Sequence, residues 1–177
     1  MDIFPGWEGY LPRLEKNWRA LVEPEDTVVL NGDISWAMSL SAAREDFAFL
    51  ESLPGTKILM KGNHDYWWAT MSRMNRFLAE NGFDTLHFLH NNTWVAGGYA
   101  LCGSRGWFFD DPSEFSEKII ARECGRLRTS IAEAEKTGLP KIVFLHYPPV
   151  AGERDGISFH LISADALHFT PQLIEKY

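Results

Sequence analysis

Apolar side chains recur at helical spacing in several stretches of the chain, among polar and charged residues. In the first stretch, Leu11, Leu14 and Trp18 fall on one side of a helix. Gly82 directly follows the third stretch, and Gly138 follows the fourth, as glycine often does where a helix ends. The pattern predicts helices over residues 6–21, 41–50, 68–81 and 114–136.

Short aliphatic runs lie between these helices and end in polar loops. Residues 27–30 stop at Asn31-Gly32-Asp33, and residues 57–60 stop at Gly62-Asn63-His64-Asp65. A third run, residues 141–145, stops at His146. Short runs of this kind, bounded by turn residues and alternating with helices, are typical of buried strands in an α/β fold.

The chain between residues 84 and 103 has a different pattern, in which short apolar pieces are separated by Asn-Asn and Gly-Gly pairs. Such pairs favour tight turns, so we expect antiparallel strands over residues 85–89, 93–96 and 99–102. Residues 157–164 are expected to form one more strand. Because the length allows one sizeable core, residues 1–177 are expected to form a single α/β domain.

Charge and composition narrow the classes of partner and location. The formal net charge is −7, and the sequence contains no run of basic residues. Duplex nucleic acid is therefore not an expected partner. No apolar stretch approaches the length of about 20 residues that spans a bilayer, so no membrane association is expected. The two cysteines, Cys102 and Cys124, lack metal-ligand or redox spacing. We expect free thiols and a cytoplasmic protein.

Metal-binding side chains follow three of the expected strands. Asp33, Asn63 and His146 each stand where a strand ends, and the carboxyl ends of strands in α/β sheets meet at one ligand-binding edge. A carboxylate, an amide oxygen and an imidazole suit a divalent ion such as Mn²⁺, Fe²⁺ or Zn²⁺. The sequence therefore predicts that these three residues hold a metal ion.

The loop after the second strand also offers groups for proton transfer. His64, next to Asn63, is a candidate general acid, and Asp65 is expected to orient its imidazole through a hydrogen bond. Arg105 follows another expected strand, where its planar guanidinium suits either a substrate phosphate or a surface ion pair. Rings from Tyr66, Trp67 and Trp68 are expected partly in the core and partly in a cleft.

Three blocks of the sequence, residues 31–33, 61–65 and 144–146, resemble signature blocks of the calcineurin-like metallophosphoesterases. The resemblance is closest to a bacterial subgroup of phosphohydrolases, through residues 32–37, 62–68 and 145–150. It implies a two-sheet α/β/β/α sandwich with two bridged metal ions. It also implies that Asp33 bridges the metals, that Asn63 and His146 bind one of them, and that His64 assists the leaving group.

Two blocks of that family have no counterpart in this sequence. The first is an initial strand ending in Asp-x-His, and the second is a Gly-His-x-His block, whose place would fall near residues 153–155. We expect a metal-dependent phosphoesterase of low activity, acting on a small phosphate ester or a phosphoprotein. A non-catalytic remnant or binding module with the same fold is the alternative. A dinucleotide-binding protein is disfavoured, because no Gly-x-Gly-x-x-Gly follows a strand.

Overall fold

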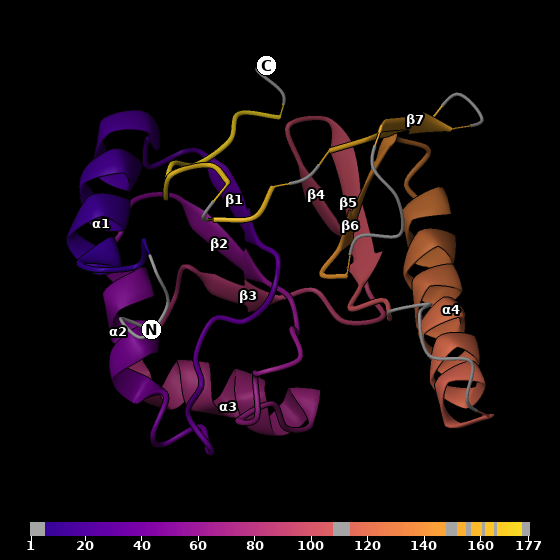
Figure 1. The fold of residues 1–177 in the computed structure, drawn as a ribbon, viewed down its shortest axis with the longest axis horizontal. Helices are drawn as coiled ribbons and strands as arrows, with labels where there is room; N and C mark the ends of the chain where they lie inside the picture. Colours follow the sequence, from indigo (N-terminus) through magenta and orange to yellow (C-terminus); the bar gives the residue numbers. More distant parts are fainter. Residues whose placement is uncertain are drawn as a thin grey trace.

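Two three-stranded sheets lie face to face in the computed structural model, with helices on the outer side of each (Figure 1). The order of layers is helix, sheet, sheet, helix, which confirms the expected α/β sandwich. The structure describes residues 6–107, 114–147, 152–154, 157–160, 162–164 and 166–174. None of the helices in these ranges is long and apolar enough to cross a membrane.

The first sheet contains β1 (Thr27–Leu30), β2 (Thr56–Leu59) and β3 (Leu86–Phe88), in that order and all parallel. The parallel direction of β3 corrects the expected antiparallel arrangement of residues 85–89. Helix α3 (Met71–Asn81) lies between β2 and β3 in the chain, and a helical crossover returns the chain in the same direction. The loops after β1 and β2 therefore leave the same edge of this sheet.

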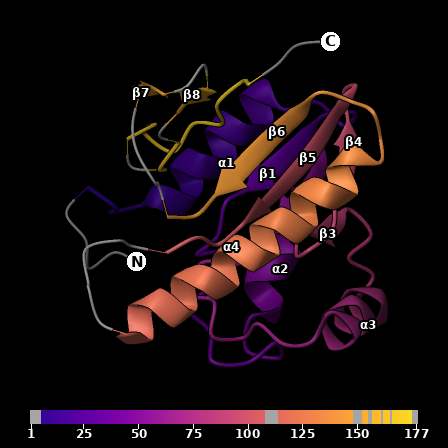
Figure 2. The same ribbon diagram turned by 90° about the vertical axis from the view of Figure 1, so that its right-hand side faces the viewer.

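The second sheet contains β4 (Trp94–Ala96), β5 (Tyr99–Ser104) and β6 (Lys141–Leu145). Strands β4 and β5 form the expected antiparallel hairpin, with Gly97 and Gly98 at its turn. Strands β5 and β6 are parallel, because helix α4 (Glu114–Glu135) connects them. Figure 2 shows α4 crossing over the outer face of this sheet.

The remaining helices, α1 (Tyr10–Leu21) and α2 (Arg44–Glu51), lie with α3 on the opposite side of the molecule from α4 (Figure 1). All four predicted helices are present. The first three begin a few residues later than the apolar pattern indicated, and α3 shows a physical reason. The Thr70 side chain accepts a hydrogen bond from the Arg73 backbone, which caps the start of the helix. Gly82 ends α3 in the left-handed conformation, with φ 68°.

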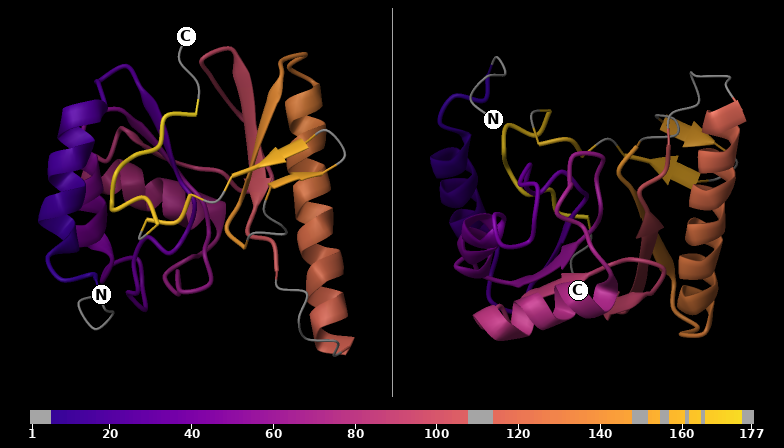
Figure 3. Two further views of the ribbon diagram at one scale, coloured as in Figure 1. Left: turned by 45° about the horizontal axis from the view of Figure 1, so that its top comes forward. Right: turned by 90° about the horizontal axis from the view of Figure 1, so that it is seen from below.

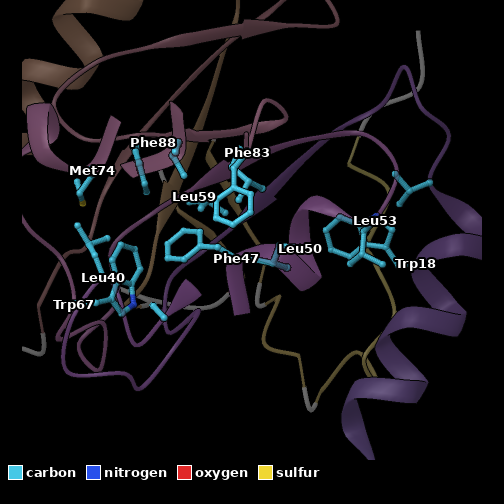
Figure 4. Close-up of a cluster of buried hydrophobic side chains, with 14 residues drawn as sticks. Trp18, Leu40, Phe47, Leu50, Leu53, Leu59, Trp67, Met74, Phe83 and Phe88 are labelled. Atoms are coloured by element: carbon cyan, nitrogen blue, oxygen red, sulfur yellow. The ribbon is translucent and has the colours of Figure 1, made fainter. Parts of the chain in front are cut away.

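Three clusters of apolar side chains fill the spaces between the four layers. The largest lies between the first sheet and helices α1 to α3, and Phe47 and Trp67 pack edge to face at its centre (Figure 4). The middle cluster joins the sheets and contains Ile58, Met60, Leu89, Leu101 and Phe144. The third, Ala100, Cys102 and Ala134, lies under α4. Since Ile58 and Met60 face one way and Leu59 the other, β2 contributes to both sides of its sheet.

A lysine lies fully buried within the first sheet. The Lys57 ammonium donates to the backbone carbonyls of Leu53 at 2.6 Å and Gly55 at 2.8 Å. Burial lowers the pKa of Lys57 from its ordinary value, while nearby Glu51 acts in the opposite direction. These two hydrogen bonds fasten the turn between α2 and β2.

The described part of the chain beyond β6 contains a short antiparallel pair, β7 (Gly152–Arg154) and β8 (Ile157–Phe159). The strand expected over residues 157–164 is thus shorter, and Asp155 lies outside the described residues. Figure 3 shows the segment after β8 running back toward α1. There the Asn17 amide donates to the Phe169 carbonyl at 3.1 Å. Cys102 is buried and Cys124 is exposed, and both are free as predicted.

Candidate metal centre

The ends of β1, β2 and β6 meet at one edge of the sandwich and bring Asp33, Asn63 and His146 together. The His146 Nε2 atom lies 2.8 Å from Asn63 Oδ1 and 3.6 Å from Asp33 Oδ1. The side chains of Asp33 and His146 keep 27% and 15% of their exposure, so solvent still reaches the cluster. Whether these residues bind a metal stays a prediction, but their positions meet the geometric requirement for it.

Two glycines allow the three loops to approach this closely. A Cβ atom on Gly62 would overlap the Asp33 carboxylate, and one on Gly32 would lie 2.7 Å from His146 Nδ1. Gly32 also has a φ of 96°, which side chains disfavour. Asp33 itself has a φ of 56°, an uncommon conformation for a residue other than glycine. Strain of this kind is held by surrounding structure and gathers at functional sites.

The orientation of the His146 ring is set by Asn31. His146 Nδ1 lies 2.8 Å from the Asn31 carbonyl oxygen, which can only accept, so Nδ1 carries the proton. The Asn31 side-chain amide in turn donates to the Leu145 carbonyl at 2.7 Å. In the neutral ring, Nε2 then presents its lone pair to Asn63 Oδ1 and Asp33 Oδ1. In that form of the ring, three hydrogen-bond acceptors face one another.

A divalent ion would relieve this crowding of acceptors. Ligand atoms about 2.0–2.2 Å from a tetrahedral ion lie about 3.4 Å from one another. The 3.6 Å between His146 Nε2 and Asp33 Oδ1 is close to this separation, and the 2.8 Å between His146 Nε2 and Asn63 Oδ1 is shorter, so an ion would have to move these two atoms apart. The donor types also suit such an ion. Among the described residues, no group of three His, Cys, Asp or Glu side chains converges in a way that could hold a metal. The candidate set reaches three donors only because the Asn63 amide oxygen completes it.

Asp65 has a different role from the one expected. Its buried carboxylate accepts hydrogen bonds from the backbone N–H groups of four residues and from an indole N–H, at 2.7–3.2 Å. The donors are Asp33, Ile34, Ser35, Gly62 and Trp67. Burial raises the pKa of Asp65, and the backbone donors oppose that shift. The carboxylate joins the loops after β1 and β2 and does not orient His64, so that expectation was wrong.

His64 lies half-buried beside the cluster. Its backbone N–H donates to Asp33 Oδ1 at 2.9 Å, and its ring Nδ1 lies 3.1 Å from the Tyr66 hydroxyl. No group in the described part of the chain bonds to its Nε2 atom. His64 is thus bonded to a candidate ligand through its backbone, while its ring contacts Trp36 and Tyr66.

Arg105 forms an ion pair, the second of its two expected roles, and the pair is largely buried. Its Nη2 lies 3.6 Å from Glu123 Oε1, with side-chain exposures of 14% and 3%. Arg126 also contacts this carboxylate, at 2.7 Å. Burial lowers the pKa of nearby Lys61, and the two arginines lower it further. Three basic side chains thus lie beside the cluster, two of them paired with Glu123, and a contact of Arg105 with phosphate stays a prediction.

Comparison with known proteins identifies the fold family. The model of the calcineurin-like phosphoesterase family matches residues 2–174. The chain belongs to this family. Membership indicates metal-dependent hydrolysis of phosphoesters. A crystal structure of a protein of unknown function from Aquifex aeolicus is similar, with 22% identity, a TM-score of 0.49, and coverage of 93% of this chain and 81% of that one. No curated protein matches the chain.

The other histidines of this calcineurin-like phosphoesterase lie outside the candidate centre. His87 packs against Trp94, and His90 packs against Trp68. Burial lowers the pKa of both rings, which keeps them neutral. His160 and His168 are exposed.

Sequence patterns did not reveal three residues that shape the candidate metal centre. Asn31 orients His146, Trp36 stacks on His64, and Tyr147 packs against His146 with ring centroids 5.0 Å apart. Asn31 and Trp36 lie within three residues of Asp33 in the sequence, and Tyr147 directly follows His146. This proximity was the only sequence feature that linked them to the site. Of the three aromatic residues after Asp65, Trp67 belongs to the core and Tyr66 is 53% exposed.

Proposed function

We propose that the chain hydrolyses phosphate mono- or diesters with a divalent metal ion held by Asp33, Asn63 and His146. The observation that carries the proposal is the convergence of Asn63 Oδ1 and Asp33 Oδ1 on His146 Nε2, at 2.8 and 3.6 Å. When bound, the ion would supply positive charge to the phosphoryl group and activate the attacking water. The identity of the ion, Mn²⁺, Fe²⁺ or Zn²⁺, is left open by the donor types.

The residues around this centre have separate tasks in the proposal. His64 donates a proton to the departing oxygen in this proposal, because its Nε2 is unbonded within the described structure and its backbone N–H is bonded to Asp33. The Asp65 carboxylate holds the loops of Asp33 and Gly62 at a fixed separation. Arg105 and Lys61 contribute positive charge that attracts an anionic ester.

Metal binding and hydrolysis measured together test this proposal. We expect the purified protein to bind one Mn²⁺ per chain in equilibrium dialysis and to hydrolyse 4-nitrophenyl phosphate or bis(4-nitrophenyl) phosphate. His146→Ala should weaken Mn²⁺ binding at least about tenfold. The matched control is His160→Ala, which removes an exposed histidine and should leave both measurements unchanged.

Each measurement can fail independently. If Mn²⁺, Fe²⁺ and Zn²⁺ all fail to bind, the metal centre is wrong and a non-catalytic remnant remains. If an ion binds through His146 and neither ester is hydrolysed, the chain is a binding module with the same fold. Equal loss of binding in the two histidine variants would show that His146 has no special role.

A further inference from the structure

A pocket opens beside the candidate metal centre, on the outer face of the second sheet. It has a volume of about 130 Å³ and lies between α4 and the ends of β5 and β6. Helix α4 contributes Ile120, Cys124 and Leu127, the end of β6 contributes Leu145, and the residues that follow the strands contribute Trp107 and Tyr147. The described residues of its wall are therefore mainly apolar.

The pocket and the metal centre share a wall. Tyr147 directly follows His146 in the chain, and the two rings lie 5.0 Å apart. The same Tyr147 ring packs edge to face on Trp107, at 5.7 Å. The guanidinium of Arg105 lies over the indole ring of Trp107, 4.9 Å from the ring centroid. A molecule whose charged group is held near His146 can thus place an attached group against Tyr147 and Trp107.

The size and polarity of the pocket define what it can hold. An apolar cavity of about 150 Å³ takes up benzene, so this one suits a single ring or a short branched chain. Glu123 also borders the pocket, but one of its carboxylate oxygens contacts Arg126 at 2.7 Å and the other is buried. Apart from Glu123, the described wall contains two residues with hydroxyl groups, Ser104 and Tyr147. A sugar or a second phosphate would leave most of its polar groups without partners there, and their desolvation would disfavour binding.

We propose that this pocket receives the organic group of the substrate, and that the substrates are phosphate esters of small apolar alcohols about the size of a single ring. The inference rests on the proposed function, because it assigns the leaving group of the same reaction. Burial of an apolar ring in the pocket would hold the ester while Arg105 attracts its phosphate.

Paired substrates test the inference directly. Benzyl phosphate and ethyl phosphate have leaving alcohols of similar acidity but differ in apolar size. We expect the ratio of their kcat/KM values to favour benzyl phosphate at least about tenfold. Leu127→Trp, which fills the pocket, should lower this ratio about tenfold or more, and the smaller change Ile120→Phe should lower it less.

A matched variant controls for the introduction of tryptophan on a helix. Leu21→Trp changes a residue that is 55% exposed on α1, on the opposite side of the molecule (Figure 1). It should leave the substrate ratio as in the wild type. A wild-type ratio near unity, or one that Leu127→Trp and Ile120→Phe do not alter, would overturn the proposal.

Cys124 provides a second measurement that does not depend on hydrolysis. It is exposed at the pocket, whereas Cys102 is buried and burial raises the pKa of its thiol. A disulfide reagent should therefore modify Cys124 first. Benzyl alcohol should slow this modification saturably in metal-free protein, by at least about twofold, and glycerol should not. In Leu127→Trp the protection should disappear.

The two measurements separate failure of the pocket from failure of the proposed function. Hydrolysis of both esters at similar kcat/KM, without protection of Cys124, would overturn the pocket and leave the phosphoesterase proposal standing. Protection of Cys124 without hydrolysis of either ester would show an apolar pocket that serves no reaction, so the substrate assignment would fall with the proposed function. Preference for benzyl phosphate together with protection of Cys124 would support both.

Discussion

The indole ring of Trp36 is stacked on the imidazole of His64, with centroids 4.4 Å apart and planes inclined by 25°. Trp36 follows β1, whereas His64 follows β2, so the contact joins two loops of the site. The Tyr66 hydroxyl approaches the edge of the same imidazole. One face and one edge of the His64 ring are thus occupied by aromatic neighbours, which limits its rotation.

His64→Ala should lower kcat by about 10² to 10⁴-fold, the usual contribution of a general acid, while bound metal stays nearly constant. Trp36→Ala should lower kcat less, because the proton donor is retained but can rotate. Trp36→Phe keeps a stacking ring and should restore most of the loss. Steady-state kinetics alongside metal analysis would check this. Loss of metal in His64→Ala would instead make His64 a ligand.

Gly62→Ala should disrupt the candidate centre for a purely steric reason. The added Cβ would overlap the Asp33 carboxylate and the Asp33 backbone nitrogen, so the two loops must separate. We expect loss of Mn²⁺ binding and a fall of about 1–3 kcal/mol in the free energy of unfolding, as for other overpacked sites. Urea unfolding and equilibrium dialysis would measure the two effects.

Gly125→Ala is the matched control for that change. Gly125 lies within α4, and a Cβ there would meet no atom within 4 Å. Alanine favours a helix over glycine by about 1 kcal/mol, so this variant should be slightly more stable than the wild type. If both variants behaved alike, close approach of the loops would not be needed for metal binding.

Asp65→Asn should destabilise the protein strongly, although it changes few atoms. The amide would turn an NH₂ group toward donors that now share the carboxylate oxygens, leaving buried N–H groups without acceptors. We expect a loss of about 2–4 kcal/mol in urea unfolding. Asp26→Asn, which alters an exposed hydrogen bond to Glu23, should cost about 0.5 kcal/mol or less. Similar losses in the two variants would contradict the anchoring role of Asp65.

The buried Lys57 should make stability depend on pH in alkaline solution. Its pKa is lowered in the folded protein, so between that value and the ordinary 10.5 the unfolded chain binds more protons. The free energy of unfolding gains a contribution that rises with pH across this window. The difference in stability between wild type and Lys57→Met should therefore increase as the pH rises toward 10.5. A flat difference for Lys57→Met would contradict the expectation.

The local patterns of the sequence predicted the helices, most strands and the residues at the strand ends, because burial imposes a period on each element. They predicted the β4–β5 hairpin but not the direction of β3. Residues 85–89 have the short apolar character of a hairpin strand, but the crossover through α3 makes β3 parallel to β2. Only the three-dimensional path of the chain decides that direction.

The sequence also did not predict which residues of the site form hydrogen bonds with one another. Asp65 stands next to His64, and adjacency suggested that the two would interact. The chain turns after His64, and this buries the carboxylate toward the loop of Asp33 and leaves the imidazole beside Tyr66. Two side chains adjacent in sequence point to different neighbours, which a spacing argument does not resolve.

The two sheets are built from successive parts of the chain, residues 27–88 for the first and 94–145 for the second. Asp33 and Asn63 come from the first part, and His146 follows the second. An ion held by all three would therefore act as a cross-link between two regions that are successive in the chain. Its binding free energy would add to their association, about 2.7 kcal/mol when the free ion is a hundred times its dissociation constant. Metal supply would then govern how firmly the halves of the protein stay joined.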